Sequence, residues 1–142
     1  MSSQNDLSGI ELLLTRLLFT AAALWNFAGA IPGYFDSAGA FTRMFGGTLD
    51  HPTLLAIYKG GWGAALVFGI GYLIVALRPT RHTGIVFIGV VGKLLFAADY
   101  LIMYQAGLTT SLALAVIAGD LVFTALFVLF LVRVKRLGLP IL

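Results

Sequence analysis

The sequence predicts an all-α integral membrane protein, a bundle of four helices with both termini in the cytoplasm. Three observations lead to this class. The chain of 142 residues is 60% hydrophobic and only 11% charged, whereas soluble domains are typically about 25% charged. Its mean hydropathy is +1.00. Its apolar stretches run for roughly the 20 residues that a helix needs to cross a bilayer. A soluble fold of this size could not bury so much apolar surface, so lipid must serve as part of the solvent.

Proline and glycine residues set the limits of the four stretches. Pro32 and the glycine after it should end the first helix, because proline lacks the N–H that continues a helix. Pro52 suits the first turn of the second helix, and Pro79 should follow its end. Gly107 is placed to terminate the third helix. We therefore expect one transmembrane domain over residues 1–142, with helices at about 10–31, 53–77, 83–105 and 110–132.

The basic residues predict the orientation of these helices. Lysine and arginine are enriched in cytoplasmic loops. Arg78 and Arg81 lie between the second and third helices, and Arg133, Lys135 and Arg136 follow the fourth. The connection between the first two helices carries a single arginine, and the last connection carries none. This bias indicates that both termini are cytoplasmic.

The long first connection has a helical pattern of its own. Aromatic and small residues recur at helical spacing, with Asp36, Ser37 and Arg43 between them: Tyr34, Phe35, Ala38, Phe41 and Phe45. Such a pattern is typical of a short amphipathic helix that lies in the membrane interface. We expect this helix at about residues 35–45. The alternative is an ordered loop packed over the bundle.

Small residues mark one face of the second helix. Gly61, Ala65 and Gly69 repeat every four residues, a spacing that allows close approach of helix backbones in lipid. The stripe could pack within the bundle, which we favour, or form the interface of a homodimer.

Charged residues within the membrane helices are the main functional signal. A charge near the bilayer centre costs at least about 2.5 kcal/mol, so it normally has a partner or a wet cavity. Counting 1.5 Å per residue, Lys93 on the third helix and Asp120 on the fourth both lie about 15 Å deep. We expect these two side chains to form a buried ion pair at the midplane.

A second pair is expected nearer the outer surface. Lys59 and Asp99 each lie a little under about 10 Å below the outer ends of their helices. Asn26 and Trp25, in the outer half of the first helix, are expected to join this second pair. The candidate polar cluster within the membrane therefore consists of Asn26, Lys59, Lys93, Asp99 and Asp120. It is either a pair of structural locks that fix helix register or a pocket that binds a ligand or passes protons.

Several function classes find no support in the sequence. Most basic residues lie at helix ends, not on one face as nucleic-acid binding requires. The chain has no cysteine, which excludes thiolate metal sites. His51 and His82 should lie at opposite faces of the membrane, which disfavours a shared haem. No nucleophile with a base and an orienting acid is apparent, so the sequence leans away from an enzyme and predicts no catalytic or metal-binding residue. Quinone or lipid remain candidate ligands.

The overall plan resembles the DoxX-like group of small four-helix bacterial membrane proteins. The resemblance is carried by residues 15–19, TRLLF, followed by a helix of small residues and by glycine-rich second and third helices. It covers the architecture of the whole chain and assigns no site residues. It implies the bacterial inner (plasma) membrane, and an association with membrane redox complexes that are often linked to quinone.

Three functions follow as hypotheses. The leading one is a non-catalytic inner-membrane accessory or partner-binding protein that contacts lipid and another membrane protein. The second is a redox-associated or lipophilic-ligand-binding protein with a polar pocket inside the membrane. The third is a small proton-linked transporter, which would need a dimer to supply enough helices for alternating access.

Overall fold

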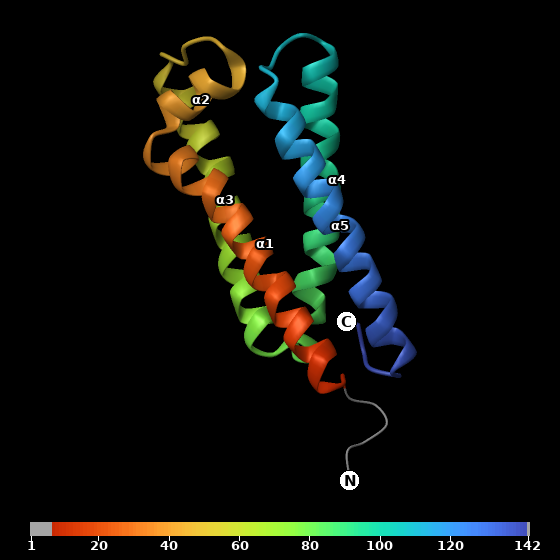
Figure 1. The fold of residues 1–142 in the computed structure, drawn as a ribbon. Helices are drawn as coiled ribbons and strands as arrows, with labels where there is room; N and C mark the ends of the chain where they lie inside the picture. Colours follow the sequence, from red (N-terminus) through yellow and green to blue (C-terminus); the bar gives the residue numbers. More distant parts are fainter. Residues whose placement is uncertain (1–6, 142) are drawn as a thin grey trace.

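A computed structural model describes residues 7–141 as five α-helices and one 3₁₀ turn (Figure 1). The elements in chain order are α1 Gly9–Phe35, α2 Ser37–Phe45, α3 Pro52–Leu77, the 3₁₀ turn Pro79–Arg81, α4 Thr83–Gln105 and α5 Leu112–Arg136. All except α2 and the 3₁₀ turn are long and apolar enough to span a membrane. The expected four-helix membrane bundle is therefore confirmed. The start of α1 and the end of α5 lie at the same end of the bundle (Figure 1).

The surface of the bundle is apolar along its length. Many large hydrophobic side chains on all four long helices are exposed. The exposed fraction is 61% for Leu24, 68% for Val67, 62% for Leu95 and 64% for Leu129. In water this surface would destabilise the folded protein, because exposing apolar area to water has a free-energy cost that grows with the area. The exposed side chains are therefore the lipid-facing surface of a multi-pass membrane protein.

The four long helices form two pairs. Helix α1 packs mainly against α3, and α4 packs mainly against α5 (Figure 1). The pairs are joined in the half of the bundle where α1 begins and α5 ends, by a core of fully buried rings. Phe127 of α5 lies 4.9 Å from Phe19 of α1 and 5.1 Å from Tyr72 of α3, measured between ring centroids. This aromatic core fixes the half of the bundle in which α1 begins and α5 ends.

Helix α1 does not end at Pro32, so that prediction is wrong. The helix continues to Phe35, and the N–H of Asp36 still donates to the carbonyl of Pro32 at 2.8 Å. Proline within a membrane helix removes only the hydrogen bond to the carbonyl four residues earlier, here Ala28, and neighbouring helices can support the remaining turns. Gly33 has a packing role, because a Cβ at this position would overlap the ring of Trp62 on α3.

Helix α5 is shifted relative to the expected range. It begins at Leu112 and not at residue 110, and it ends at Arg136 and not at residue 132. The chain then turns at Gly138, whose φ of 72° lies in the left-handed region that favours glycine. The turn brings the tail under the start of α4, where Thr83 Oγ1 donates to the carbonyl of Pro140 at 3.1 Å.

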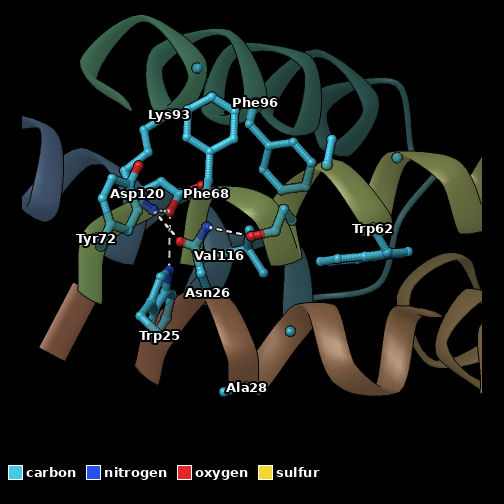
Figure 2. A pocket seen from close by; sticks show the side chains of 15 residues that line it. Trp25, Asn26, Ala28, Trp62, Phe68, Tyr72, Lys93, Phe96, Val116 and Asp120 are labelled. Carbon is cyan, nitrogen blue, oxygen red and sulfur yellow. Dashed lines mark hydrogen bonds and ion pairs between the residues drawn. The ribbon is translucent and has the colours of Figure 1, made fainter. Parts of the chain in front are cut away.

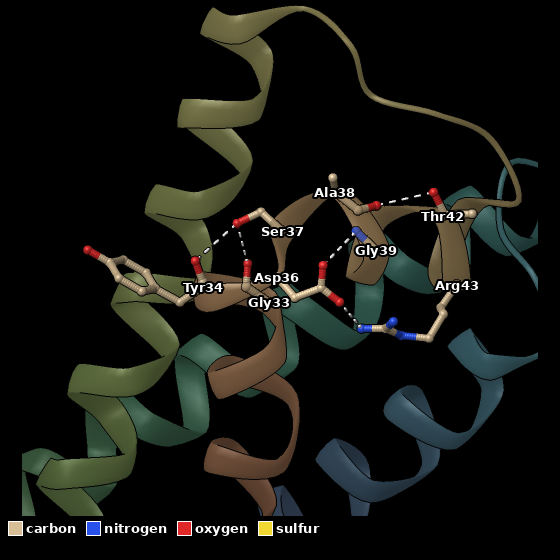
Figure 3. Close-up of polar contacts among 8 residues, drawn as sticks. All are labelled: Gly33, Tyr34, Asp36, Ser37, Ala38, Gly39, Thr42 and Arg43. Atoms are coloured by element: carbon tan, nitrogen blue, oxygen red, sulfur yellow. Dashed lines mark hydrogen bonds and ion pairs between the residues drawn. The ribbon is translucent and has the colours of Figure 1, made fainter.

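The short helix in the first connection is confirmed as α2. Asp36 begins it by accepting a hydrogen bond from the N–H of Gly39 at 3.2 Å and by pairing with Arg43 at 3.2 Å (Figure 3). Ser37 Oγ donates to the carbonyls of Gly33 and Tyr34 (Figure 3). These contacts turn the chain at Asp36, the single residue between α1 and α2, so that α2 runs across the end of α1 (Figure 3).

Helix α2 covers the end of the bundle opposite the start of α1 (Figure 1). The rings of Phe41 and Phe45 pack against Tyr58 of α3, at 5.3 and 6.2 Å between centroids. The backbone N–H of Thr110, in the loop between α4 and α5, donates to the carbonyl of Met44 at 2.7 Å. The helix thus contacts both pairs and packs over the bundle. Its position in the membrane interface stays a prediction.

The small-residue stripe of α3 is only partly turned toward the inside of the molecule, since Gly69 is buried and Gly61 is exposed. A Cβ at Gly69 would lie 2.5 Å from the ring of Phe27 on α1, so this glycine is needed for packing between α1 and α3. Gly61 and Ala65 line an internal cavity described below. Since Gly69 is buried against α1, the three residues cannot together form the homodimer face considered from the sequence.

Replacing Gly69 with leucine should destabilise the bundle, because the added side chain meets the ring of Phe27. Overpacking of this kind typically costs about 1 to 3 kcal/mol. Gly60→Leu is the matched control, since a Cβ at Gly60 meets nothing within 4 Å. Thermal unfolding in mild detergent should show a lower midpoint for Gly69→Leu alone. Equal midpoints for the two variants would contradict the packing.

Candidate functional site

An ion pair lies in the middle of the bundle. Lys93 Nζ of α4 is 2.6 Å from Asp120 Oδ1 of α5, and each residue is only 5% exposed. The sequence prediction for this pair is confirmed. The pair neutralises two charges that would each be costly in the hydrocarbon region.

A tryptophan from the other helix pair also donates a hydrogen bond to Asp120. Trp25 Nε1 of α1 donates to Asp120 Oδ1 at 3.0 Å. The ring of Trp25 lies against Gly119, where a Cβ would overlap it. The glycine beside Asp120 therefore lets the indole of α1 approach α5 closely enough to donate.

Asn26 extends the network to the remaining helix. Lys93 Nζ donates to Asn26 Oδ1 at 3.0 Å, and Asn26 Nδ2 donates to the carbonyl of Ala65 on α3 at 3.1 Å (Figure 2). The network joins all four long helices at one level. It is a polar link between the α1–α3 pair and the α4–α5 pair.

A cavity of about 260 Å³ lies beside this network. Its walls are mainly aromatic and small side chains, and the charged and amide groups are gathered at one end of it (Figure 2). Three small residues of its lining are exposed at the molecular surface: Ala28, Gly61 and Ala64. The full lining is Trp25, Asn26, Ala28, Gly29, Gly61, Trp62, Ala64, Ala65, Phe68, Tyr72, Gly92, Lys93, Phe96, Val116 and Asp120.

The polar end of the cavity retains hydrogen-bonding capacity. An ammonium has three N–H donors, and within residues 7–141 Lys93 uses two of them, on Asp120 and Asn26. Asp120 Oδ1 accepts both of the hydrogen bonds made to that carboxylate, and Oδ2 receives none from the described residues. One donor and one acceptor thus remain at the end of an apolar cavity.

Aromatic rings also surround the ammonium. Lys93 Nζ lies 5.5 Å from the ring centroid of Phe123 and 5.7 Å from that of Tyr72. Ring faces attract a cation at such distances, more strongly where water is excluded. These rings help to offset the loss of hydration of the lysine.

The predicted pair of Lys59 with Asp99 is wrong. Lys59 Nζ lies over the ring of Tyr34 of α1, 4.6 Å from its centroid, and Asp99 is exposed on α4. The two residues have similar depth, but α3 packs mainly against α1 and α4 against α5. Equal depth therefore did not bring them to a shared face, and neither residue lines the cavity.

Asn26 and Trp25 join a different cluster from the one predicted. They contact Lys93 and Asp120, not Lys59 and Asp99. The first helix continues past Pro32, so Asn26 lies closer to its middle than the sequence indicated. Of the five residues in the predicted polar cluster, the structure brings together Asn26, Lys93 and Asp120.

The aromatic lining of the cavity does not follow from the sequence analysis. Trp62 and Tyr72 of α3 and Phe96 of α4 line the cavity, as does Phe68. A tryptophan in the outer part of a membrane helix is typical of the interfacial aromatic belt, and this common role hides the other one. A periodicity shared with Ala65 could have pointed to Trp62, since residues three or four apart lie on one helix face.

The residues that the structure describes hold no group of His, Asp and Glu side chains able to bind a metal ion. Comparison with protein-family models, curated proteins and solved structures finds no match. The chemistry of the site therefore rests on its own geometry. That geometry suits the binding of a molecule with an apolar body and a small polar group.

Removing one member of the ion pair should destabilise the protein by about 3 to 5 kcal/mol, because the other charge remains buried without a partner. Lys93→Met and Asp120→Asn each leave one such charge. The double variant leaves none, and it should lose less stability than either single variant. Thermal unfolding in mild detergent measures all three. Additive losses in the double variant would show that the two residues are not coupled.

Proposed function

We propose that this protein binds a lipophilic molecule with a flat ring and an uncharged polar group in the cavity beside Lys93 and Asp120. The observation that carries the proposal is the cavity itself, apolar and aromatic along its walls and polar at one end. Small-molecule sites have this character, and about 260 Å³ is near the lower limit of their usual volumes. The size favours insertion of a ring-sized part of the ligand.

The ion pair favours an uncharged ligand. Lys93 and Asp120 already balance each other, so an additional charge beside them would be buried without a partner. A carbonyl oxygen can accept the remaining N–H of Lys93. A hydroxyl can instead donate to Asp120 Oδ2. Quinones and ring-containing lipids carry these groups on an apolar body.

Access from the bilayer supports the same ligand class. The exposed small residues of the lining, Ala28, Gly61 and Ala64, belong to the apolar exterior of α1 and α3. A molecule dissolved in lipid could reach the cavity between them without crossing water. A quinone would also agree with the resemblance to DoxX-like proteins. An accessory role, in which the bundle surface contacts another membrane protein, stays a prediction and does not account for the cavity.

The basic residues support an orientation with the start of α1 and the end of α5 in the cytoplasm, and the resemblance to DoxX-like proteins supports a location in the bacterial inner membrane. Arg78 and Arg81 lie at the same end of the molecule as Arg133, Lys135 and Arg136. Positive charge at one end is retained on the cytoplasmic side during insertion.

Intrinsic fluorescence should report occupancy, because the only two tryptophans of the chain, Trp25 and Trp62, both line the cavity. Menadione, a flat diketone, should quench this fluorescence saturably. Methylnaphthalene, which lacks the carbonyls, should compete about tenfold more weakly, since a hydrogen bond from a charged donor contributes about 1.5 to 3 kcal/mol. The Lys93→Met, Asp120→Asn double variant should lose this difference between the two probes.

Gly61→Phe should abolish saturable quenching by placing a ring in the cavity. Gly60→Phe is the matched control, because both glycines have open space around an added Cβ but only Gly61 lines the cavity. Thermal unfolding checks that both variants are folded. Saturable quenching that survives Gly61→Phe would refute the proposed site.

Orientation can be tested by labelling, since the chain has no cysteine of its own. Gly9→Cys and Gly47→Cys introduce thiols at opposite ends, and neither position has an atom within 4 Å of an added Cβ. A membrane-impermeant maleimide applied to intact cells should label Gly47→Cys. It should label Gly9→Cys only after lysis. The reverse result would show that the orientation is inverted.

A further inference from the structure

A second hollow lies on the outside of the bundle, between the start of α1 and the end of α5. Its volume is about 360 Å³. Its walls are leucine and phenylalanine side chains together with one threonine, and two charged residues also line it. The lining residues are Leu7, Glu11, Leu14, Thr15, Leu18, Leu126, Phe130 and Arg133. This groove, which we call the α1–α5 groove, is separate from the cavity beside Lys93.

An ion pair joins the two helices at the groove. Arg133 Nε lies 2.8 Å from Glu11 Oε1, and the two side chains are 45% and 33% exposed. Glu11 is held from its other side by the N–H of Ser8, which donates to Oε2 at 2.9 Å. The pair therefore has a fixed position, and it leaves the Nη groups of Arg133 without an acceptor among residues 7–141.

Positive charge exceeds negative charge at this end of α5. Arg136 follows Arg133 by three residues, a spacing that places both on one side of a helix. Lys135 is rotated by about 200° from Arg133 at 3.6 residues per turn, so it lies on the opposite side. Glu11 offsets one of the two arginines beside the groove. The groove thus combines apolar walls with a net positive end.

We propose that the α1–α5 groove is a binding site for one anionic phospholipid. An acyl chain lies along the leucines and Phe130, and the phosphate accepts hydrogen bonds from the Nη groups of Arg133. The helix ends place Arg133 at the level of lipid headgroups, since it lies in the last turn of α5. Arginine binds phosphate through two parallel N–H donors, and basic pockets between membrane helices select anionic headgroups in the same way.

The occupant follows from the surroundings of the groove. It opens on the lipid-facing surface, where acyl chains are the most abundant apolar partners. The backbones of α1 and α5 come close to each other at few positions, so an acyl chain in the groove fills space that the side chains leave open between the two helices. The groove does not depend on the proposed ligand of the cavity, and its test uses different variants.

The test measures which phospholipids stay bound to the purified protein. The protein is reconstituted in vesicles with equal amounts of phosphatidylcholine and phosphatidylglycerol, extracted in mild detergent and examined by native mass spectrometry. Phosphatidylglycerol should be enriched among the retained lipids. Arg133→Gln should reduce the enrichment about fivefold, the effect of one basic residue at a lipid surface. Glu11→Gln should increase it, because it removes the competing carboxylate.

Matched variants separate the groove from general charge attraction. Lys135→Gln removes the same charge from the opposite side of α5 and should leave the enrichment unchanged. Leu126→Trp fills the groove and should reduce the amount of lipid retained, whereas Leu121→Trp, at an exposed position outside it, should not. Equal losses for Arg133→Gln and Lys135→Gln, or no enrichment in the unaltered protein, would overturn the proposal. Circular dichroism confirms that each variant is helical.

Discussion

The ion pair between Lys93 and Asp120 is the constraint around which the membrane part of this protein is arranged. Either charge alone would be costly at the centre of a bilayer, so α4 and α5 must present them at one level and on facing sides. Trp25 and Asn26 then bring α1 to the same point, and Asn26 reaches the carbonyl of Ala65 on α3. The register of all four long helices is thereby set by a single polar network.

The two halves of the bundle have different roles. The half in which α1 begins is closely packed around Phe19, Tyr72 and Phe127, whose rings bring the helix pairs together. The half that α2 covers holds the cavity, and the polar network lies between the two halves. A closely packed half can hold the polar groups in place while a less filled half leaves space for a ligand. Binding sites commonly combine a rigid support with a small number of placed polar groups in this way.

Composition and hydropathy were sufficient to predict the four membrane helices and the level of the Lys93–Asp120 pair, because both depend only on position along the chain. The facing of side chains was not predictable in the same way, since it depends on which helices pair. Lys59 and Asp99 have similar depth but lie on surfaces that do not meet. The assumed end of α1 at Pro32 also placed Asn26 too near the outer surface. The cavity is formed by side chains from four helices, and no single stretch of sequence contains it.

The contacts of α2 have a mechanical consequence. This helix lies between α1 and α3 in the chain, yet it also contacts the other pair through Thr110 of the α4–α5 loop. The backbone N–H of Thr110 donates to the carbonyl of Met44, and its hydroxyl donates to the carbonyl of Arg43. A helix of nine residues therefore bridges the two pairs at the end of the bundle opposite the start of α1. Because the aromatic core also holds the pairs together in the half where α1 begins, the distance between the pairs is fixed on both sides of the cavity. The length of α2 therefore limits the width of the space between the two helix pairs, and with it the width of a molecule that could fit there.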